Sequence, residues 1–267
     1  MAAGGRLRAV TRKPMEAKKG GSFTHFLAIP FTNELVLSNF AIFKNRILND
    51  VDNCDKANID ESLFQNPKKI HVTFGIMNLT SNEEEEKACS ILRTFNHEVL
   101  LPIIRDSGPL VVNMRGVSFF GDDPKETHVL FATLKSEERL QKIADDLVDR
   151  FAQAGLMDRT DSGVKLHVTL MNSVFRARSL QRQQRYPRHN HGDRFGSRGR
   201  HNIKRTPFDS TNILQDFAEF SFSEDLILPG IHLSNARITD KQTGFYAPRF
   251  KVDFETEKRD ESTDTSK

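Results

Sequence analysis

Two stretches of the chain share one pattern and begin 96 residues apart. KIHVTFGIMN occupies residues 69–78, and KLHVTLMNSV occupies residues 165–174. Each opens with lysine, an apolar residue, histidine, valine, threonine and another apolar residue. Because successive side chains of a β-strand point to opposite faces, the histidine and the threonine share one face and the apolar residues share the other. The apolar face suits a hydrophobic core. The pattern therefore predicts two strands whose histidine and threonine border a cleft or solvent.

The segments around these two strands alternate between helix and strand patterns. Ser81, followed three residues later by Glu84, is a typical signal for the start of a helix. Apolar residues recur at helical spacing at 33–49, 81–105, 136–154 and 212–220. Strand patterns fall at 23–31, 70–78, 110–120, 128–134, 164–175, 220–238 and 245–254. The recurrence predicts an α+β fold of two related lobes, with antiparallel or mixed sheets.

Composition excludes several classes of protein. The 267 residues are 37% apolar and 28% charged, which is typical of a globular protein with a sizeable core. The apolar runs are short, so no membrane span and no membrane partner are expected. Two cysteines, Cys54 and Cys89, are too few for a disulfide framework or a zinc cluster. Reduced thiols fit a cytosolic or nuclear compartment, and residues 1–22 lack the apolar segment of a secretory signal.

Positive charge is concentrated in one segment. Residues 176–205 carry a net charge of +9, although the whole chain carries only +3. The segment has no hydrophobic period, and we expect an Arg/His/Gly-rich insert at about 177–207. Such a segment is either a contact for a polyanion or a solvated loop that nothing touches. Residues 1–22 are expected to be a flexible basic tail and residues 255–267 a disordered tail, which leaves one domain at 23–254.

The paired motifs suit the cleavage of a phosphodiester. This reaction needs one group that takes a proton from the nucleophile and another that protonates the leaving oxygen. Histidine titrates near neutral pH, so His71 and His167 are the candidate base and acid, in either order. Thr73 and Thr169 can donate hydrogen bonds to the phosphate oxygens, where negative charge develops. The chemistry requires neither a metal nor a cofactor, and the sequence has no ligand framework that indicates a metal site.

Several residues near these motifs have two interpretations each. Lys69 and Lys165 either hold the anion or simply flank it, and Tyr246 either lines a base pocket or packs in the core. A third His-x-Ser pattern, at His232, is expected by chance and is interpreted as a strand histidine with a local hydrogen bond. His25 is interpreted as a packing histidine. Either main motif alone fits a half-buried histidine, but two copies at matching points of a repeated topology favour catalysis or phosphate binding.

The sequence around both motifs resembles the 2H phosphoesterase superfamily. The likeness is greatest to the branch that includes the first subunit of the activating signal cointegrator complex and the related domain of A-kinase anchor protein seven. It runs from about Phe23 to Phe254, and the dual motif with FQNPKK before it is specific. The stretches that carry it are FTHFLAIPFTN (23–33), DESLFQNPKKIHVTFGIM (60–77), GVSFFGDDP (116–124), RFAQAGLM (150–157), VKLHVTLMNSVFR (164–176) and FDSTNIL (208–214).

That resemblance implies a bilobal LigT-like fold, in which two sheets face a central cleft with the helices outside. It implies a metal-independent phosphodiesterase for RNA-type or 2′,3′-cyclic phosphodiesters, with His71 and His167 as acid and base and with Thr73 and Thr169 as phosphate ligands. It also implies protein partners in a cointegrator-type complex of transcription and DNA-alkylation repair. The implied location is the nucleus, with the cytoplasm as an alternative.

Members of the cointegrator branch usually carry an RNA-binding KH domain ahead of this domain. About 22 residues precede it here, without a GxxG loop, so no KH domain is expected. The Arg-rich insert is the alternative RNA contact, because arginine binds phosphate in a bidentate manner. Its candidate contacts are Arg182, Arg185, Arg188, Arg194, Arg198 and Arg200. The alternatives to catalysis are a nucleotide- or RNA-binding module without turnover and a scaffold subunit of the complex.

Overall fold

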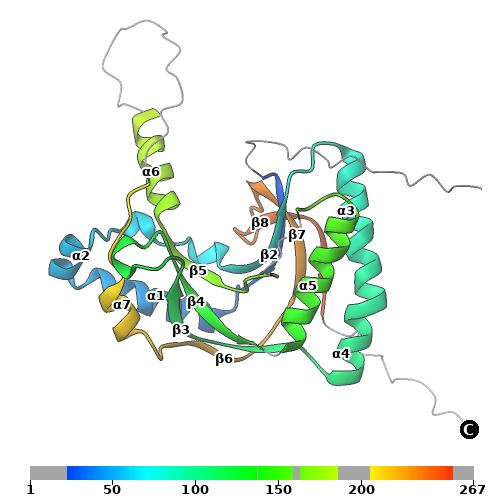
Figure 1. Cartoon of the computed structure of the whole chain (residues 1–267), viewed down its shortest axis with the longest axis horizontal. Helices are drawn as coiled ribbons and strands as arrows, with labels where there is room; N and C mark the ends of the chain where they lie inside the picture. The colour runs from blue at the N-terminus through cyan, green and yellow to red at the C-terminus, as the bar shows by residue number, and fades with distance from the viewer. Residues whose placement is uncertain (1–22, 137, 159–162, 186–204, 255–267) are drawn as a thin grey trace, which may run out of the picture.

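A computed structural model describes residues 23–136, 138–158, 163–185 and 205–254, and Figure 1 labels its elements. The predicted tails at 1–22 and 255–267 lie outside the described residues, as do residues 186–204 of the predicted insert. Within the described ranges, no helix is long and apolar enough to cross a membrane.

The strands form one curled sheet of eight antiparallel strands, so the expectation of two separate sheets was wrong. Strands β2 and β5 pair in the middle, and this pairing joins the sheets of the two lobes edge to edge. The order is nevertheless symmetric about the junction, because β1, β7 and β8 on one side match β4, β3 and β6 on the other. In sheet order the strands are β6 (Ser221–Ile227), β3 (Val111–Phe119), β4 (Val129–Ser136), β5 (Val168–Asn172), β2 (His71–Met77), β1 (His25–Pro30), β7 (Gly230–Thr239) and β8 (Tyr246–Asp253).

The helices flank the sheet, with α3, α4 and α5 on one side and α1, α2 and α7 on the other (Figure 1). The helices predicted at 33–49 and 136–154 are present as α1 and α5. Helix α2 was not predicted, because its seven residues bury only Cys54 and Ala57 and show no period. The bounds are α1 (Glu34–Leu48), α2 (Val51–Ala57), α3 (Asn82–Phe95), α4 (Leu101–Ser107), α5 (Glu138–Gln153), α6 (Ser173–Arg185) and α7 (Thr211–Asp216).

The helix predicted at 81–105 is interrupted. Helix α3 passes into a π-helical turn at Asn96–Leu100, and α4 follows at once. Pro102 lies in the first turn of α4, lacks a backbone N–H, and crowds the carbonyl of Glu98 four residues earlier. A wider turn relieves that conflict. The apolar pattern does not reveal the change because the same face stays buried across it.

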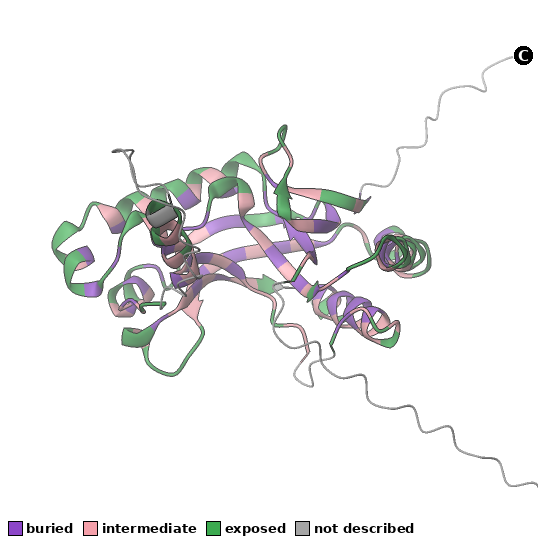
Figure 2. Ribbon diagram, turned by 90° about the horizontal axis from the view of Figure 1, so that it is seen from above, coloured by how far each residue is buried: buried purple, intermediate pink, exposed green. Residues whose placement is uncertain are grey.

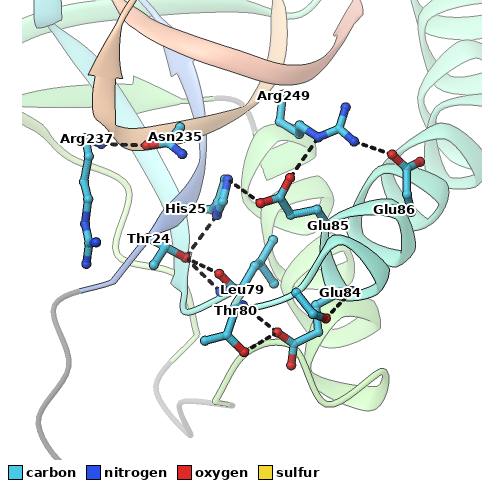
Figure 3. A network of polar contacts seen from close by, with 11 residues as sticks. Thr24, His25, Leu79, Thr80, Glu84, Glu85, Glu86, Asn235, Arg237 and Arg249 are labelled. Atoms are coloured by element: carbon cyan, nitrogen blue, oxygen red, sulfur yellow. Dashed lines mark hydrogen bonds and ion pairs between the residues drawn. The ribbon is translucent and has the colours of Figure 1, made fainter.

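A polar network ties the start of α3 to the sheet (Figure 3). Ser81 caps the helix as predicted, because its hydroxyl accepts a hydrogen bond from the Glu84 N–H at 3.2 Å. The next residue, Glu85, accepts a hydrogen bond from Arg249 of β8 at 2.9 Å and lies 3.8 Å from Nε2 of His25. His25 is 2% exposed, and burial lowers its pKa although Glu85 acts in the opposite direction. His25 is therefore a packing histidine, as the sequence indicated.

The strand predicted at 164–175 is shorter than expected. Strand β5 ends at Asn172, and α6 begins at Ser173 and extends to Arg185. Helix α6 thus enters the segment that has no hydrophobic period. The sequence pattern could not show this helix, because a buried arginine, rather than an apolar stripe, anchors it to the fold.

Arg176 fixes the base of α6. Arg176 is 8% exposed, and its guanidinium bonds to two separate parts of the chain, at Asn58 and Asp60 and at Thr206. It donates to the Asn58 carbonyl at 2.9 Å, to the Asp60 carboxylate at 3.1 Å and to the Thr206 carbonyl at 2.6 Å. Thr206 is where the chain returns from the predicted insert. Arg176 therefore holds both ends of that segment at one point of the fold.

Buried residues follow the sheet and the inner sides of the helices (Figure 2). An aromatic group fixes α1 against the first half of the sheet. The Phe43 ring of α1 lies 4.7 Å from the Phe217 ring and 5.4 Å from the Phe222 ring of β6, measured between centroids. Such edge contacts between fully buried rings stabilise a fixed packing angle. These contacts fix the position of α1 against β6.

Candidate active site

The two His-Val-Thr triplets meet in the middle of the sheet and run in opposite directions. Val72 of β2 lies opposite Val168 of β5 in antiparallel register, and both valines are fully buried. Strand alternation places the histidine and threonine of each triplet on the other face. There His71, Thr73, His167 and Thr169 are all partly exposed. The structure thus brings together the four side chains that the repeated motif singled out.

Both triplets are followed by the same irregularity. In β2 the register against β1 skips Phe74, the residue after Thr73. In β5 the register against β4 skips Leu170, the residue after Thr169. An extra residue of this kind bends the strand and re-aims the side chains beside it, and such bulges are common next to active sites. The sequence repeat therefore corresponds to a repeat in local strand geometry.

The two imidazoles are held by the same contact. Nδ1 of His71 lies 2.7 Å from the carbonyl oxygen of Lys69, and Nδ1 of His167 lies 2.7 Å from that of Lys165. A carbonyl oxygen only accepts hydrogen bonds, so Nδ1 of each ring carries a proton. Nε2 is then the nitrogen that can exchange a proton with a substrate. The lysines of the repeated motif thus orient the histidines through their backbones, a role that the sequence pattern did not suggest.

His71 is the more enclosed of the two histidines. Burial lowers its pKa to about 4; the positive charges of His167 and Lys69 act in the same direction, and the hydrogen bond to the Lys69 carbonyl opposes them. His71 is therefore neutral at pH 7 and can accept a proton at Nε2. Its aromatic neighbours, by the distance between ring centroids, are Phe26 at 5.3 Å, Phe245 at 5.8 Å and Tyr246 at 5.9 Å.

His167 lies between two phenylalanines of the other half. Its ring centroid is 4.8 Å from that of Phe120 and 5.4 Å from that of Phe131, both in edge-on contact. Phe120 is 36% exposed, whereas Phe245 beside His71 is 3% exposed. The environments of the two histidines thus differ, although their motifs match.

Lys69 and Lys165 precede the strands rather than lying in them, so strand alternation does not direct their side chains. Lys69 ends the short 3₁₀ helix Pro67–Lys69, and its ammonium reaches β7 and β8 of the same half of the sheet. It donates to the Thr239 hydroxyl at 2.9 Å and lies 4.2 Å from the centre of the Tyr246 ring. Lys69 and Tyr246 therefore both border the His71 side of the site, while Lys165 is exposed.

Of the six arginines predicted to contact nucleic acid, Arg182 is the one whose side chain the structure describes. It is exposed on α6, and its charge is close enough to lower the pKa of Lys69, after burial as the larger cause. Arg178, one helical turn earlier, is close enough to oppose the rise in the Tyr246 pKa that burial causes. Arg185 ends α6, and Arg188, Arg194, Arg198 and Arg200 lie outside the described residues.

Sequence reasoning missed Arg178 and the aromatic rings around the histidines. Arg178 and Arg182 stand four residues apart, which is a helical spacing, but no apolar stripe accompanies it. Phe26 and Phe131 lie in other strands and Phe120 directly follows β3, so only the three-dimensional pairing brings their rings to the histidines. The available signal was the content of 21 phenylalanines, and this number does not indicate which rings lie beside the histidines.

The third His-x-Ser pattern, at His232, lacks the local hydrogen bond that the sequence led us to expect. His232 lies on β7 opposite Ala28, and Ala28 lies opposite Thr73. Among the described residues, neither Nδ1 of His232 nor Oγ of Ser234 has a hydrogen-bond partner, so the expected local hydrogen bond at Nδ1 is absent. Across the residues that the structure describes, no three His, Cys, Asp or Glu side chains lie close enough together to hold a metal ion.

Comparison with known proteins places the chain among its relatives. A model of the AKAP7 2′5′ RNA ligase-like domain matches residues 23–254. A mouse protein, activating signal cointegrator 1 complex subunit 1, is 36% identical over 238 residues, which are 87% of this chain and 63% of the mouse protein. The chain thus spans less than two thirds of that relative. An uncharacterized protein of Schizosaccharomyces pombe is 27% identical over 152 residues, which are 56% of this chain and 66% of that protein.

A solved structure supports the same assignment at the level of the fold. The crystal structure of a phosphoesterase matches with a TM-score of 0.50 at 12% sequence identity, over 86% of this chain and 97% of that one. The family match, the paired motifs and their meeting point in the sheet agree with one another. The chain therefore belongs to the AKAP7 2′5′ RNA ligase-like family of 2H phosphoesterase domains.

Proposed function

We propose that this protein is a metal-independent phosphoesterase that cleaves RNA-type or 2′,3′-cyclic phosphodiesters. The observation that carries the proposal is the pair of imidazoles, each held at Nδ1 by a carbonyl 2.7 Å away and each free to exchange a proton at Nε2. Two threonines beside them supply hydroxyl donors for the phosphate oxygens. Proton transfer at both ends of the reaction and stabilisation of the phosphate are the functions that such a cleavage needs.

The surroundings of the two histidines suggest their roles. We assign the base to His71, because its pKa of about 4 leaves it neutral at physiological pH. It takes the proton from the attacking hydroxyl, which is a water or the 2′-hydroxyl of a ribose. His167, on the more open side, is then the acid that protonates the leaving oxygen. Thr73 and Thr169 donate to the non-bridging oxygens as the charge on phosphorus rises.

The test uses His71→Ala and His167→Ala with nucleoside 2′,3′-cyclic phosphates, short RNA and matched DNA, in the presence of EDTA. Each substitution should lower kcat by about 10²–10⁴-fold, because each removes one proton-transfer step. Thr73→Val serves as a matched variant that keeps both histidines. Full activity in both folded histidine variants contradicts the assignment. Cleavage of RNA but not of DNA indicates that the substrate supplies its own 2′-hydroxyl as nucleophile.

A binding module without turnover is the competing function. The same side chains can hold a nucleotide or an RNA end inside a larger assembly. Chromatographic analysis of the products separates the two cases, because a binding module retains the nucleotide unchanged. Nucleotide binding that the histidine substitutions abolish, without any product from the unsubstituted protein, favours the binding module over the enzyme.

We further propose that the chain takes part in a nuclear complex of the cointegrator type. The support is its 36% identity to the mouse complex subunit, over 63% of that protein. Purification of the tagged chain from nuclear extract should recover the other subunits of that complex in stoichiometric amounts. Mass spectrometry identifies them, and a double substitution of His71 and His167 should leave their recovery unchanged. Absence of every cointegrator subunit from the purified material rejects this assembly.

A further inference from the structure

Three cations, Lys69, Arg178 and Arg182, lie near one another beside the site: the charge of Arg182 acts on Lys69, and that of Arg178 acts on Tyr246, which Lys69 contacts. Burial lowers the pKa of Lys69, and among the described residues Arg182 is the one charged group that adds to this effect. Among the described residues, no carboxylate acts on Lys69 in the opposite direction. A partly buried ammonium near a guanidinium is unfavourable on its own, because like charges repel and burial weakens hydration. An arrangement of this kind is stabilised when an anion binds between the cations.

Helix α6 carries two of these cations on one face. Arg178 and Arg182 are four residues apart, so their side chains lie one above the other on the helix. Both are exposed, and their charges act on Tyr246 and Lys69 of the opposite half. Figure 1 shows α6 rising from the end of β5, the strand that carries Thr169 and directly follows His167.

The third cation is held from below. The Lys69 ammonium donates to the Thr239 hydroxyl at 2.9 Å and rests on the Tyr246 ring at 4.2 Å. The base of α6 is equally fixed, because the buried guanidinium of Arg176 bonds to Asn58, Asp60 and Thr206. The cations therefore stand on rigid supports on two sides of the same site. Such a site is preorganised, which lowers the entropic cost of binding an anion.

We propose that Arg178, Arg182 and Lys69 bind the phosphate that flanks the scissile phosphate in a single-stranded RNA. This inference rests on the proposed function, because it takes the phosphodiester between His71 and His167 as the reaction site. The flanking group is the next backbone phosphate, for example the one on the 5′ oxygen of a terminal nucleoside 2′,3′-cyclic phosphate. Arginine binds such a group with two parallel hydrogen bonds. The preferred substrate is accordingly an oligonucleotide rather than a mononucleotide.

The experiment compares two substrates that differ only in the flanking phosphates. One is adenosine 2′,3′-cyclic phosphate, and the other is the trinucleotide ApApA ending in the same cyclic phosphate. The double variant Arg178→Ala/Arg182→Ala should lower kcat/KM for the trinucleotide roughly 10- to 100-fold. It should change kcat/KM for the mononucleotide by less than about twofold. Gln183→Ala on the same helix and Lys142→Ala on α5 are the matched controls, and neither should change the ratio of the two substrates.

Binding provides a second readout that does not depend on turnover. Fluorescence anisotropy with a labelled ApApA 3′-phosphate should show that the double variant lowers the slope of log affinity against log salt by roughly 0.7, which corresponds to one lost phosphate contact on a single strand. The inference is overturned if the double variant keeps the unsubstituted protein's kcat/KM for the trinucleotide and its salt slope. It is also overturned if the double variant loses kcat/KM equally on both substrates. If the unsubstituted protein cleaves neither substrate, the proposed function fails, and the anisotropy result alone then decides whether the flanking site exists.

Discussion

At the scale of single residues, the repeated histidine and threonine could be selected from the sequence but their roles could not. Two identical motifs give no reason to prefer either histidine as base. The difference comes from rings at the ends of other strands, chiefly Phe245 beside His71 and Phe120 beside His167. The lysine carbonyls that orient both rings were also beyond sequence reasoning, because backbone contacts do not depend on the lysine side chain.

The lowered pKa of His71 predicts an unusual pH profile. A neutral His71 is needed to accept a proton, so activity is present above its pKa and is lost as the pH falls through about 4. The acid limb of kcat/KM should therefore lie near pH 4 rather than near 6.5, the ordinary value for histidine. Steady-state rates on a nucleoside 2′,3′-cyclic phosphate from acidic to neutral pH measure it, with circular dichroism to verify folding.

A matched variant tests the physical cause. Phe245→Ala removes part of the cover over His71 and should move the acid limb upward, whereas Phe120→Ala, beside His167, should leave that limb in place. An acid limb near pH 6.5 in the unsubstituted protein contradicts the assignment of His71 as the enclosed base. If the acid limb moves by the same amount in both variants, burial of His71 is not the cause of its low pH.

At the scale of elements, prediction succeeded where apolar periodicity was long and failed where polar contacts decide. Helices α1 and α5 each bury a full apolar face, and both were predicted. Helix α6 was missed because Arg176 is its buried anchor. The π-helical turn at Asn96–Leu100 was missed because it keeps the same face inward while it changes the number of residues in the turn.

The anchor of α6 gives a prediction about stability. Arg176→Met removes a buried guanidinium and leaves the carbonyls of Asn58 and Thr206 without their donor. The free energy of unfolding should fall by about 2–3 kcal/mol, because buried acceptors lose hydrogen bonds to a charged group. Urea denaturation followed by circular dichroism measures this. Arg105→Met is the control: its side chain is 72% exposed, and it should change stability by less than about 0.5 kcal/mol. Equal effects of the two substitutions would show that the buried contacts add no stability.

At the scale of the whole molecule, the sequence repeat predicted two related halves but not how they join. Strand and helix patterns are local, whereas the pairing of Val72 with Val168 connects residues 96 positions apart. That one pairing turns two expected sheets into a single sheet of eight strands. The α+β class and the approximate symmetry could be read from the sequence, and the join between the halves needed the structure.

The matching contacts of the two histidines have a consequence for how such proteins diverge. Since both rings are oriented by the same backbone carbonyl two residues earlier, the motif itself does not set the direction in which a proton crosses between them. That direction depends on which of the two histidines is more buried. Substitution of a few neighbouring aromatic side chains can therefore exchange the roles of base and acid while both motifs stay intact. Two relatives with identical triplets need not use the same histidine as base.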